Sequence, residues 1–388
     1  MQRTTLLALS SSALTALCSA QTASFTATEL APLVFQFTDT STGGTPTAWA
    51  WDFDGDGNPD DTNQNPVWVF QEGGGYPVTL TVTFASSTAT TTQEVFPNAI
   101  TLPPFGSTFS SGALTRGYWF QTPERFSIIS LQVPDESAHG TQNVAVYRMS
   151  SPPPVFSANA TGGLEFFEAG TPSNVKIPCV VSYDVGEYVG VLGACGDATT
   201  MRNSYCNATQ AQPGELLGVP IQLSRFLTQT NIVTNNGMGA YSTEVNGYVT
   251  RIYTEVTPCV GIPYGDGSPS SQAPAPVLST TALPFLGQTA ELTVENSDTA
   301  ALGIVAVGIG RANVPSPLGT VLIGSIDGSV ALNNGALMNP GSYTFQWAIP
   351  NNPALQGFGP VNWQAASLVT GTGEFALSNG NEWWLSAQ

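Results

Sequence analysis

The chain has 388 residues, with 27 Asp and Glu against 9 Lys and Arg and a formal net charge of −18. This length predicts two or three domains, and the acidic balance excludes nucleic-acid binding through phosphate neutralisation. Only 9% of the residues are charged, while the chain has 40 Gly and 29 Pro. That composition favours many short strands joined by turns, so we expect an all-β protein.

Residues 1–20 have the pattern of a secretory signal peptide. Arg3 supplies the positive start, an apolar run extends from Leu6 to Leu17, and Cys18-Ser19-Ala20 ends in small residues. We therefore expect a secreted, extracellular protein without a membrane span, because the apolar run is too short for a permanent anchor. Cys18 also permits a lipidated lipoprotein, which the bulky Leu17 before it disfavours.

The stretch from Trp49 to Asp61 carries the most chemical information. Trp49, Trp51 and Phe53 stand at alternate positions, which places three rings on one face of a strand. The strand runs into a turn with five carboxylates: Asp52, Asp54, Asp56, Asp60 and Asp61. Oxygen-only ligands select a hard cation and fit calcium, so we expect either a single-loop calcium site or an unmetallated Asp/Gly turn. An EF-hand is excluded because Asn63 stands where its bidentate Glu belongs.

Roughly residues 22–97 also carry a specific family resemblance. It rests on four motifs: Phe37-Thr38-Asp39-Thr40-Ser41, Ala50-Trp51-Asp52-Phe53 with Asp54-Gly55-Asp56-Gly57, Asn65-Pro66-Val67-Trp68-Val69-Phe70, and Gly75-Tyr76-Pro77-Val78-Thr79-Leu80-Thr81-Val82. Together they resemble a PKD (polycystic-kidney-disease-type) domain, with an extra Asp before the first Gly. The resemblance implies an immunoglobulin-like β-sandwich over residues 21–100, used for spacing or binding in extracellular proteins, and it implies no catalysis.

Residues 105–260 are expected to form a second β domain. Strand-like segments recur throughout it: 117–120, 126–131, 144–147, 179–183, 188–192 and 248–253. Their number and spacing predict a jelly-roll-like β-sandwich. Two long loops, 150–160 and 194–214, are where binding is expected on such a scaffold. The stretch 191–205 looks like a module of bacterial exported proteins.

Four cysteines remain after signal cleavage: Cys179, Cys195, Cys206 and Cys259. An even number in an exported protein predicts two disulfides. Three pairings are possible, and we prefer Cys195 with Cys206 and Cys179 with Cys259. Zinc ligation is disfavoured because the chain lacks a Cys-x-x-Cys pair and has a single histidine, His139.

Residues 262–388 are expected to form a third domain, a C-terminal β-sandwich. Prolines and glycines between 261 and 276 predict a linker before it. Alternating segments such as 290–294, 304–307, 343–347 and 362–366 predict its strands. The segments 349–357 and 377–380 resemble a C-terminal domain of secreted bacterial proteins, so the whole chain resembles a PKD-domain-containing secreted bacterial protein.

The sequence favours binding over catalysis. A Ser/His/Asp triad would need His139, which lies in a polar, turn-like segment, and a Gly-x-Ser-x-Gly elbow is absent. We therefore expect a non-catalytic extracellular binding or cell-surface structural protein that contacts glycans or other proteins. The alternative is a secreted hydrolase, such as a glycosidase, with its site in the middle domain; its candidate carboxylates are Glu124, Asp135, Glu165 and Glu168.

Overall fold

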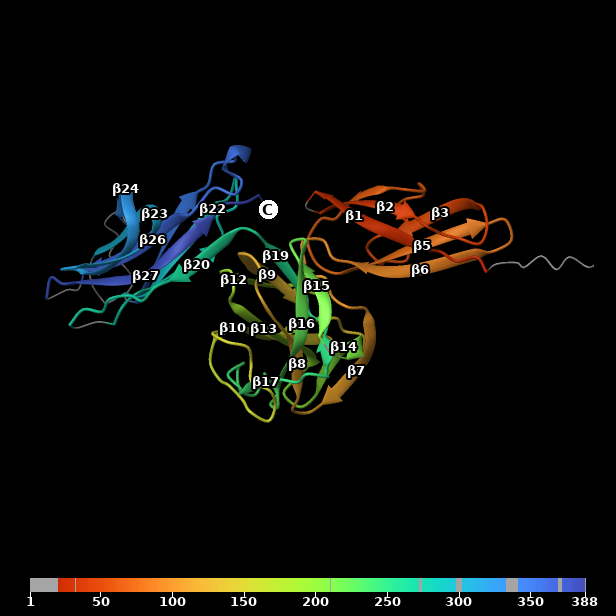
Figure 1. Cartoon of the computed structure of the whole chain (residues 1–388), viewed down its shortest axis with the longest axis horizontal. Helices are drawn as coiled ribbons and strands as arrows, with labels where there is room; N and C mark the ends of the chain where they lie inside the picture. The colour runs from red at the N-terminus through yellow and green to blue at the C-terminus, as the bar shows by residue number, and fades with distance from the viewer. Residues whose placement is uncertain are drawn as a thin grey trace, which may run out of the picture. The chain divides into compact units, whose positions relative to one another are not determined.

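The computed structural model describes residues 20–31, 33–209, 211–271, 274–297, 302–332, 341–368 and 372–387 (Figure 1). These residues separate into two compact units. The first contains the described residues up to Gln71 and from Gly75 to Pro97; the second contains Glu72–Gly74 and the residues from Asn98 onward. The predicted signal peptide lies outside the described residues except for Ala20.

The first unit is built from two three-stranded antiparallel sheets. One has the order β1 (Phe25–Ala31), β2 (Val34–Asp39), β4 (Val67–Val69), and the other β3 (Pro46–Asp52), β5 (Tyr76–Phe84), β6 (Thr88–Val95). Burial alternates along β5, where Val78, Leu80 and Val82 are buried and the residues between them are half-buried. Because burial alternates with a period of two residues, one face of each sheet packs into a shared core. This pattern is expected of a sandwich.

Residues 105–257 of the second unit form two further sheets. The larger has ten strands, six of them in the order β11-β10-β13-β8-β16-β15, with β14, β17, β18 and β7 paired beside them. The smaller has the order β12-β9-β19. The strands are β7 (Phe105–Ser111), β8 (Thr115–Gln121), β9 (Phe126–Gln132), β10 (Thr141–Met149), β11 (Leu164–Pro172), β12 (Ile177–Tyr183), β13 (Tyr188–Gly196), β14 (Met201–Thr209), β15 (Gln212–Leu216), β16 (Val219–Thr228), β17 (Tyr241–Thr243), β18 (Tyr248–Thr250) and β19 (Tyr253–Thr257).

The predicted long loop 194–214 is wrong. Strand β13 continues to Gly196, β14 occupies Met201–Thr209, and β15 begins at Gln212. The register of β14 on β7, from Met201 opposite Ser111 to Cys206 opposite Phe105, shows why. Backbone pairing with a distant strand supplies the hydrogen bonds, which the polar composition of the segment did not reveal.

The remaining residues of the second unit form a five-stranded sheet, in the order β20-β27-β26-β23-β24, and a three-stranded sheet, in the order β21-β22-β25. The strands are β20 (Val260–Tyr264), β21 (Val277–Ala282), β22 (Thr289–Ser297), β23 (Leu302–Ser316), β24 (Gly319–Leu332), β25 (Gly341–Ala348), β26 (Val361–Leu368) and β27 (Phe375–Trp384). One short 3-10 turn, η1 (Pro353–Leu355), precedes β26. The predicted all-β class with tandem β-sandwiches is confirmed.

The start of the predicted second linker is a strand. Residues Val260–Tyr264 form β20, which pairs with β27 from Val260 opposite Trp384 to Tyr264 opposite Gly380. The second unit thus contains both regions that the sequence divides at residues 260–262. Their division into two separate domains stays a prediction.

Candidate functional site

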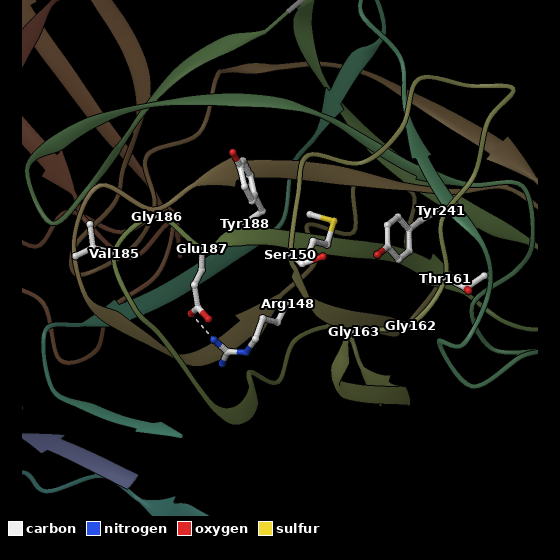
Figure 2. Close-up of a pocket in the computed structure, with 11 residues that line it drawn as sticks. Arg148, Ser150, Thr161, Gly162, Gly163, Val185, Gly186, Glu187, Tyr188 and Tyr241 are labelled. Atoms are coloured by element: carbon white, nitrogen blue, oxygen red, sulfur yellow. Dashed lines mark hydrogen bonds and ion pairs between the residues drawn. The ribbon is translucent and has the colours of Figure 1, made fainter. Parts of the chain in front are cut away.

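A pocket of about 520 Å³ opens in the second unit, beside the end of β10 and the turn between β12 and β13 (Figure 2). Its lining combines charged, hydroxyl-bearing, aromatic and glycine residues: Arg148, Met149, Ser150, Thr161, Gly162, Gly163, Val185, Gly186, Glu187, Tyr188 and Tyr241. This volume lies within the range of about 300–1,000 Å³ that small-ligand pockets occupy.

Strand pairing brings these distant segments together. Met149 on β10 lies opposite Tyr188 on β13, and Ala160 bridges Tyr241. The amide of Arg148 donates to the carbonyl of Gly163 at 2.7 Å. Gly163 has φ 71°, and a Cβ there would lie 2.1 Å from the carbonyl oxygen of Arg148, so this close approach requires glycine.

Arg148 is the electrostatic centre of the pocket. Its guanidinium pairs with Glu187, and its Nε lies 3.2 Å from Oε1 of Glu165. It also donates to the carbonyl of Ser182 and stacks over the ring of Tyr183, 4.7 Å from the ring centroid. Burial lowers the pKa of Arg148, but the two carboxylates outweigh burial and raise it above its ordinary value. One guanidinium against two carboxylates leaves one net negative charge.

Two tyrosines supply aromatic surface to the pocket. Tyr188 is half-buried, and its ring centroid lies 6.2 Å from that of Trp119. Tyr241 is buried in a cluster with Tyr147 and Phe226, at centroid distances of 5.5 and 5.1 Å. Figure 2 shows the hydroxyl of Tyr241 directed towards the Ser150 side of the pocket. Burial raises the pKa of Tyr241, so the hydroxyl stays protonated and can donate to a ligand.

Next to the pocket, Asp184 belongs to a cluster of ion pairs that joins the two sandwiches of the second unit. Asp184 forms an ion pair with Arg125 at 2.9 Å and accepts a hydrogen bond from Arg311 at 3.0 Å, and Arg311 also pairs with Glu382 at 2.8 Å. Arg125 stacks over the ring of Trp384, 5.2 Å from its centroid. Burial raises the pKa of both Asp184 and Glu382, but hydrogen bonds and the arginines outweigh it and hold each pKa below its ordinary value.

The predicted carboxylate cluster is partly assembled in the first unit. Asp52, Asp54 and Asp60 each place one oxygen within 4.8 Å of the others. Asp52 accepts from the amides of Gly55 and Gly57, at 2.7 and 2.9 Å, and both glycines use positive φ. These residues could hold a cation, although the turn is also stabilised by its own amide donors.

The other two predicted metal ligands lie outside this group. The carboxylate of Asp56 accepts from the amide of Asn58 at 2.7 Å, and that of Asp61 from the amide of Asn63 at 2.7 Å. The backbone of Asp61 instead closes the turn, because its carbonyl accepts from the amide of Trp51 at 2.9 Å. Sequence spacing alone does not separate the grouped carboxylates from these two.

The four cysteines are free and buried, so neither preferred disulfide is present in the structure. Cys206 donates to the carbonyl of Ala208, Cys179 to that of Ile128 and Cys195 to that of Val133. Cys259 packs with Leu283 and Phe285. Burial raises the pKa of Cys179 and of Cys259 to about 12, which keeps both protonated and unreactive.

None of the four candidate carboxylates for a hydrolase lines the pocket, although Glu165 pairs with the lining residue Arg148. Asp135 accepts from the backbone amide of His139 at 3.0 Å and from the hydroxyl of Ser173 at 2.8 Å, so it shapes a turn. Burial raises the pKa of Asp135, and these hydrogen bonds lower it below its ordinary value. Sequence analysis did not identify Arg148, Glu187 or Tyr241 as site residues. The predicted long loop 150–160, which follows β10, was the feature that indicated this end of the sandwich.

Among the described residues, the structure has no helix long and apolar enough to cross a membrane. No curated protein matches the chain. Residues 18–96 match the family model of the PKD domain. The match covers the aromatic core, the carboxylate turn and both sheets of the first unit. The N-terminal unit of this chain is therefore a PKD domain, an immunoglobulin-like module of the extracellular binding and structural type.

Proposed function

We propose that the protein is a secreted, non-catalytic binding protein that holds a neutral carbohydrate in the pocket beside Arg148. The PKD domain supports an extracellular setting and serves as the spacing or structural module. The single observation that carries the proposal is the lining of the pocket, where tyrosine rings adjoin an ion pair and several hydroxyl groups.

Sugars present two kinds of surface, and the pocket offers a partner for each. Their C–H faces are apolar and stack on flat rings, such as that of the lining residue Tyr188. Their hydroxyl groups donate and accept hydrogen bonds, and Arg148 with Glu187 offers donors and acceptors side by side. Backbone at Gly162 and Gly163 adds surface without side chains.

Charge selects neutral sugars over acidic ones. Arg148 is paired with two carboxylates, Glu187 in the pocket lining and Glu165 beside it, and the chain has a formal net charge of −18. An anionic polysaccharide would meet like charge both at the pocket and across the surface. Uronic-acid and sulfated polymers are therefore expected to bind more weakly than uncharged ones of the same length.

The test is calorimetric titration of the mature full-length chain with cellohexaose, maltohexaose and laminarihexaose. Replacing Tyr188→Ala should weaken binding about 2- to 12-fold, since an aromatic contact contributes about 0.5–1.5 kcal/mol beyond its buried area. Tyr248→Ala is the matched control, because Tyr248 is exposed and does not line the pocket. Absence of binding to all three oligosaccharides, or equal losses in both variants, would overturn the proposal.

The same samples address the hydrolase alternative, because Glu165 and Glu187 place two carboxylates on one guanidinium at the pocket. Reducing ends are measured during incubation with each oligosaccharide. Release above the background of a Glu165→Gln, Glu187→Gln double variant would show catalysis and contradict a purely binding role.

A further inference from the structure

The turn between β12 and β13 takes part in two sites at once. Val185, Gly186 and Glu187 form one wall of the pocket (Figure 2). Asp184, the first residue of the same turn, pairs with Arg311 of the C-terminal sandwich. A segment of four residues therefore has a pocket contact at one end and an ion pair with another sandwich at the other.

Within the turn, hydrogen bonds link these two ends. The amide of Asp184 donates to Oε2 of Glu187 at 2.7 Å, and the same carboxylate binds Arg148. On the other side, the hydroxyl of Thr122 donates to the carbonyl of Asp184 at 2.6 Å, and the backbone carbonyl of Thr122 accepts from the amide of Gly186 at 2.9 Å. A displacement of Asp184 would thus move the carboxylate that orients Arg148.

The C-terminal sandwich holds Asp184 through a side chain that is itself fixed. Arg311 lies over the ring of Tyr264, 4.7 Å from its centroid, and its Nε contacts Glu382 at 2.8 Å. The side chain of Glu382 is only 5% exposed and also accepts from Trp384 at 2.9 Å. Arg311 is therefore held on one side by a buried carboxylate, and its Nη2 donates to Asp184 at 3.0 Å.

We propose that Arg311 is a positioning residue for the pocket, so that the C-terminal sandwich sets the shape of the wall formed by Val185, Gly186 and Glu187. The ligand in this inference comes from the proposed function, whereas the contacts between Arg311, Asp184 and the turn do not depend on it. Coupling of this kind is reciprocal: a ligand that contacts Glu187 strengthens the hold of Arg311 on Asp184, and loss of Arg311 weakens the ligand.

Hydrogen exchange of the mature full-length chain tests the coupling without any ligand. Arg311→Gln should speed exchange of the amides of Asp184 and Gly186 by about fivefold or more, the lower end of typical coupling between sites. Arg311→Lys keeps the charge but cannot bridge both carboxylates in the same planar geometry, so it should restore part of the protection. Arg202→Gln is the matched control, because Arg202 donates to Thr108 away from the turn.

Two exchange results would overturn the inference. One is unchanged protection of the turn in Arg311→Gln. The other is an equal loss of protection across β23, β26 and β27, which would show a merely structural role. Asp184→Asn, which removes the charge and keeps the shape, should reproduce the local change, so the test stands even where Arg311→Gln does not fold.

Measurements of ligand binding then distinguish a failure of this inference from a failure of the proposed function. If the unmodified chain binds one of the hexasaccharides, Arg311→Gln should weaken that binding about fivefold or more, while Arg202→Gln leaves it unchanged. Equal affinity of Arg311→Gln and the unmodified chain would overturn the coupling. If the unmodified chain binds none of them, the proposed function fails, and the exchange data alone decide the coupling.

Discussion

Replacing Trp51 with alanine should remove a large share of the stability of the PKD domain. Trp51 is fully buried, and its ring centroid lies 5.2 Å from Phe25, 5.6 Å from Phe37 and 5.8 Å from Phe53. Its indole N–H donates to the carbonyl of Asn63 at 2.8 Å, so the ring also anchors the carboxylate turn. Truncating a buried Trp to Ala costs about 3–5 kcal/mol, against a typical domain stability of about 5–15 kcal/mol.

The assay is scanning calorimetry of the full chain, in which the PKD domain should give its own transition. At about 4–8 °C per kcal/mol for a domain of this size, Trp51→Ala should lower that transition by about 12–40 °C. Trp49→Ala is the matched control on the same strand, because Trp49 is only half-buried and donates to Asp39 at 2.8 Å. The reasoning is refuted if Trp49→Ala costs as much, or if the transition of the second unit falls by the same amount.

Three further outcomes are expected. Calcium in the millimolar range should raise the melting temperature of the PKD transition, and Asp54→Ala with Asp60→Ala should abolish the rise; identical curves with calcium and with chelator would leave an unmetallated turn. Thiol titration of the mature chain, without Cys18, should find four reactive cysteines after denaturation without reductant, and a value of zero would restore the predicted disulfides. Because the pKa values of Asp184 and Glu382 lie below their ordinary 3.8 and 4.5, their stabilising contribution is complete above about pH 4.5 and is lost as the pH falls through the lower folded values. An Arg311→Gln variant should therefore lose less stability on acidification than the unmodified chain, and equal losses would contradict this.

The fold was largely predictable because its signals are local. Alternation places Trp51 and Phe53 on one face, and the structure buries both in the core of the first unit. The strand-like segments predicted at 117–120, 126–131 and 188–192 lie within β8, β9 and β13. The residues that indicate a strand are neighbours in the sequence, so a single sequence is enough to locate it.

The candidate pocket was not predictable, because its residues come from segments far apart in the chain. Arg148 meets Glu187 only through the register of β10 on β13, and Tyr241 arrives through its bridge to Ala160. Nothing in the sequence near Arg148 indicates these partners. For the cysteines, an even number in an exported protein predicts disulfides, whereas the structure has all four as free, buried thiols.

The junction after Cys259 shows why composition did not indicate strand β20. The segment 261–267 reads as a linker because of its glycines and its proline, yet Gly261 is buried where a Cβ would lie 2.2 Å from the hydroxyl of Thr280. Its amide donates to Ser182 at 2.9 Å, while the carbonyl of Cys259 accepts from Ser127 at 2.7 Å. Here glycine allows β20 to pack closely against β21, while its amide binds Ser182 of the preceding sandwich, and it does not provide flexibility. A rigid junction is also what the ion pair between Arg311 and Asp184 requires, since a side-chain contact can position a pocket wall only where the backbone beside it is fixed.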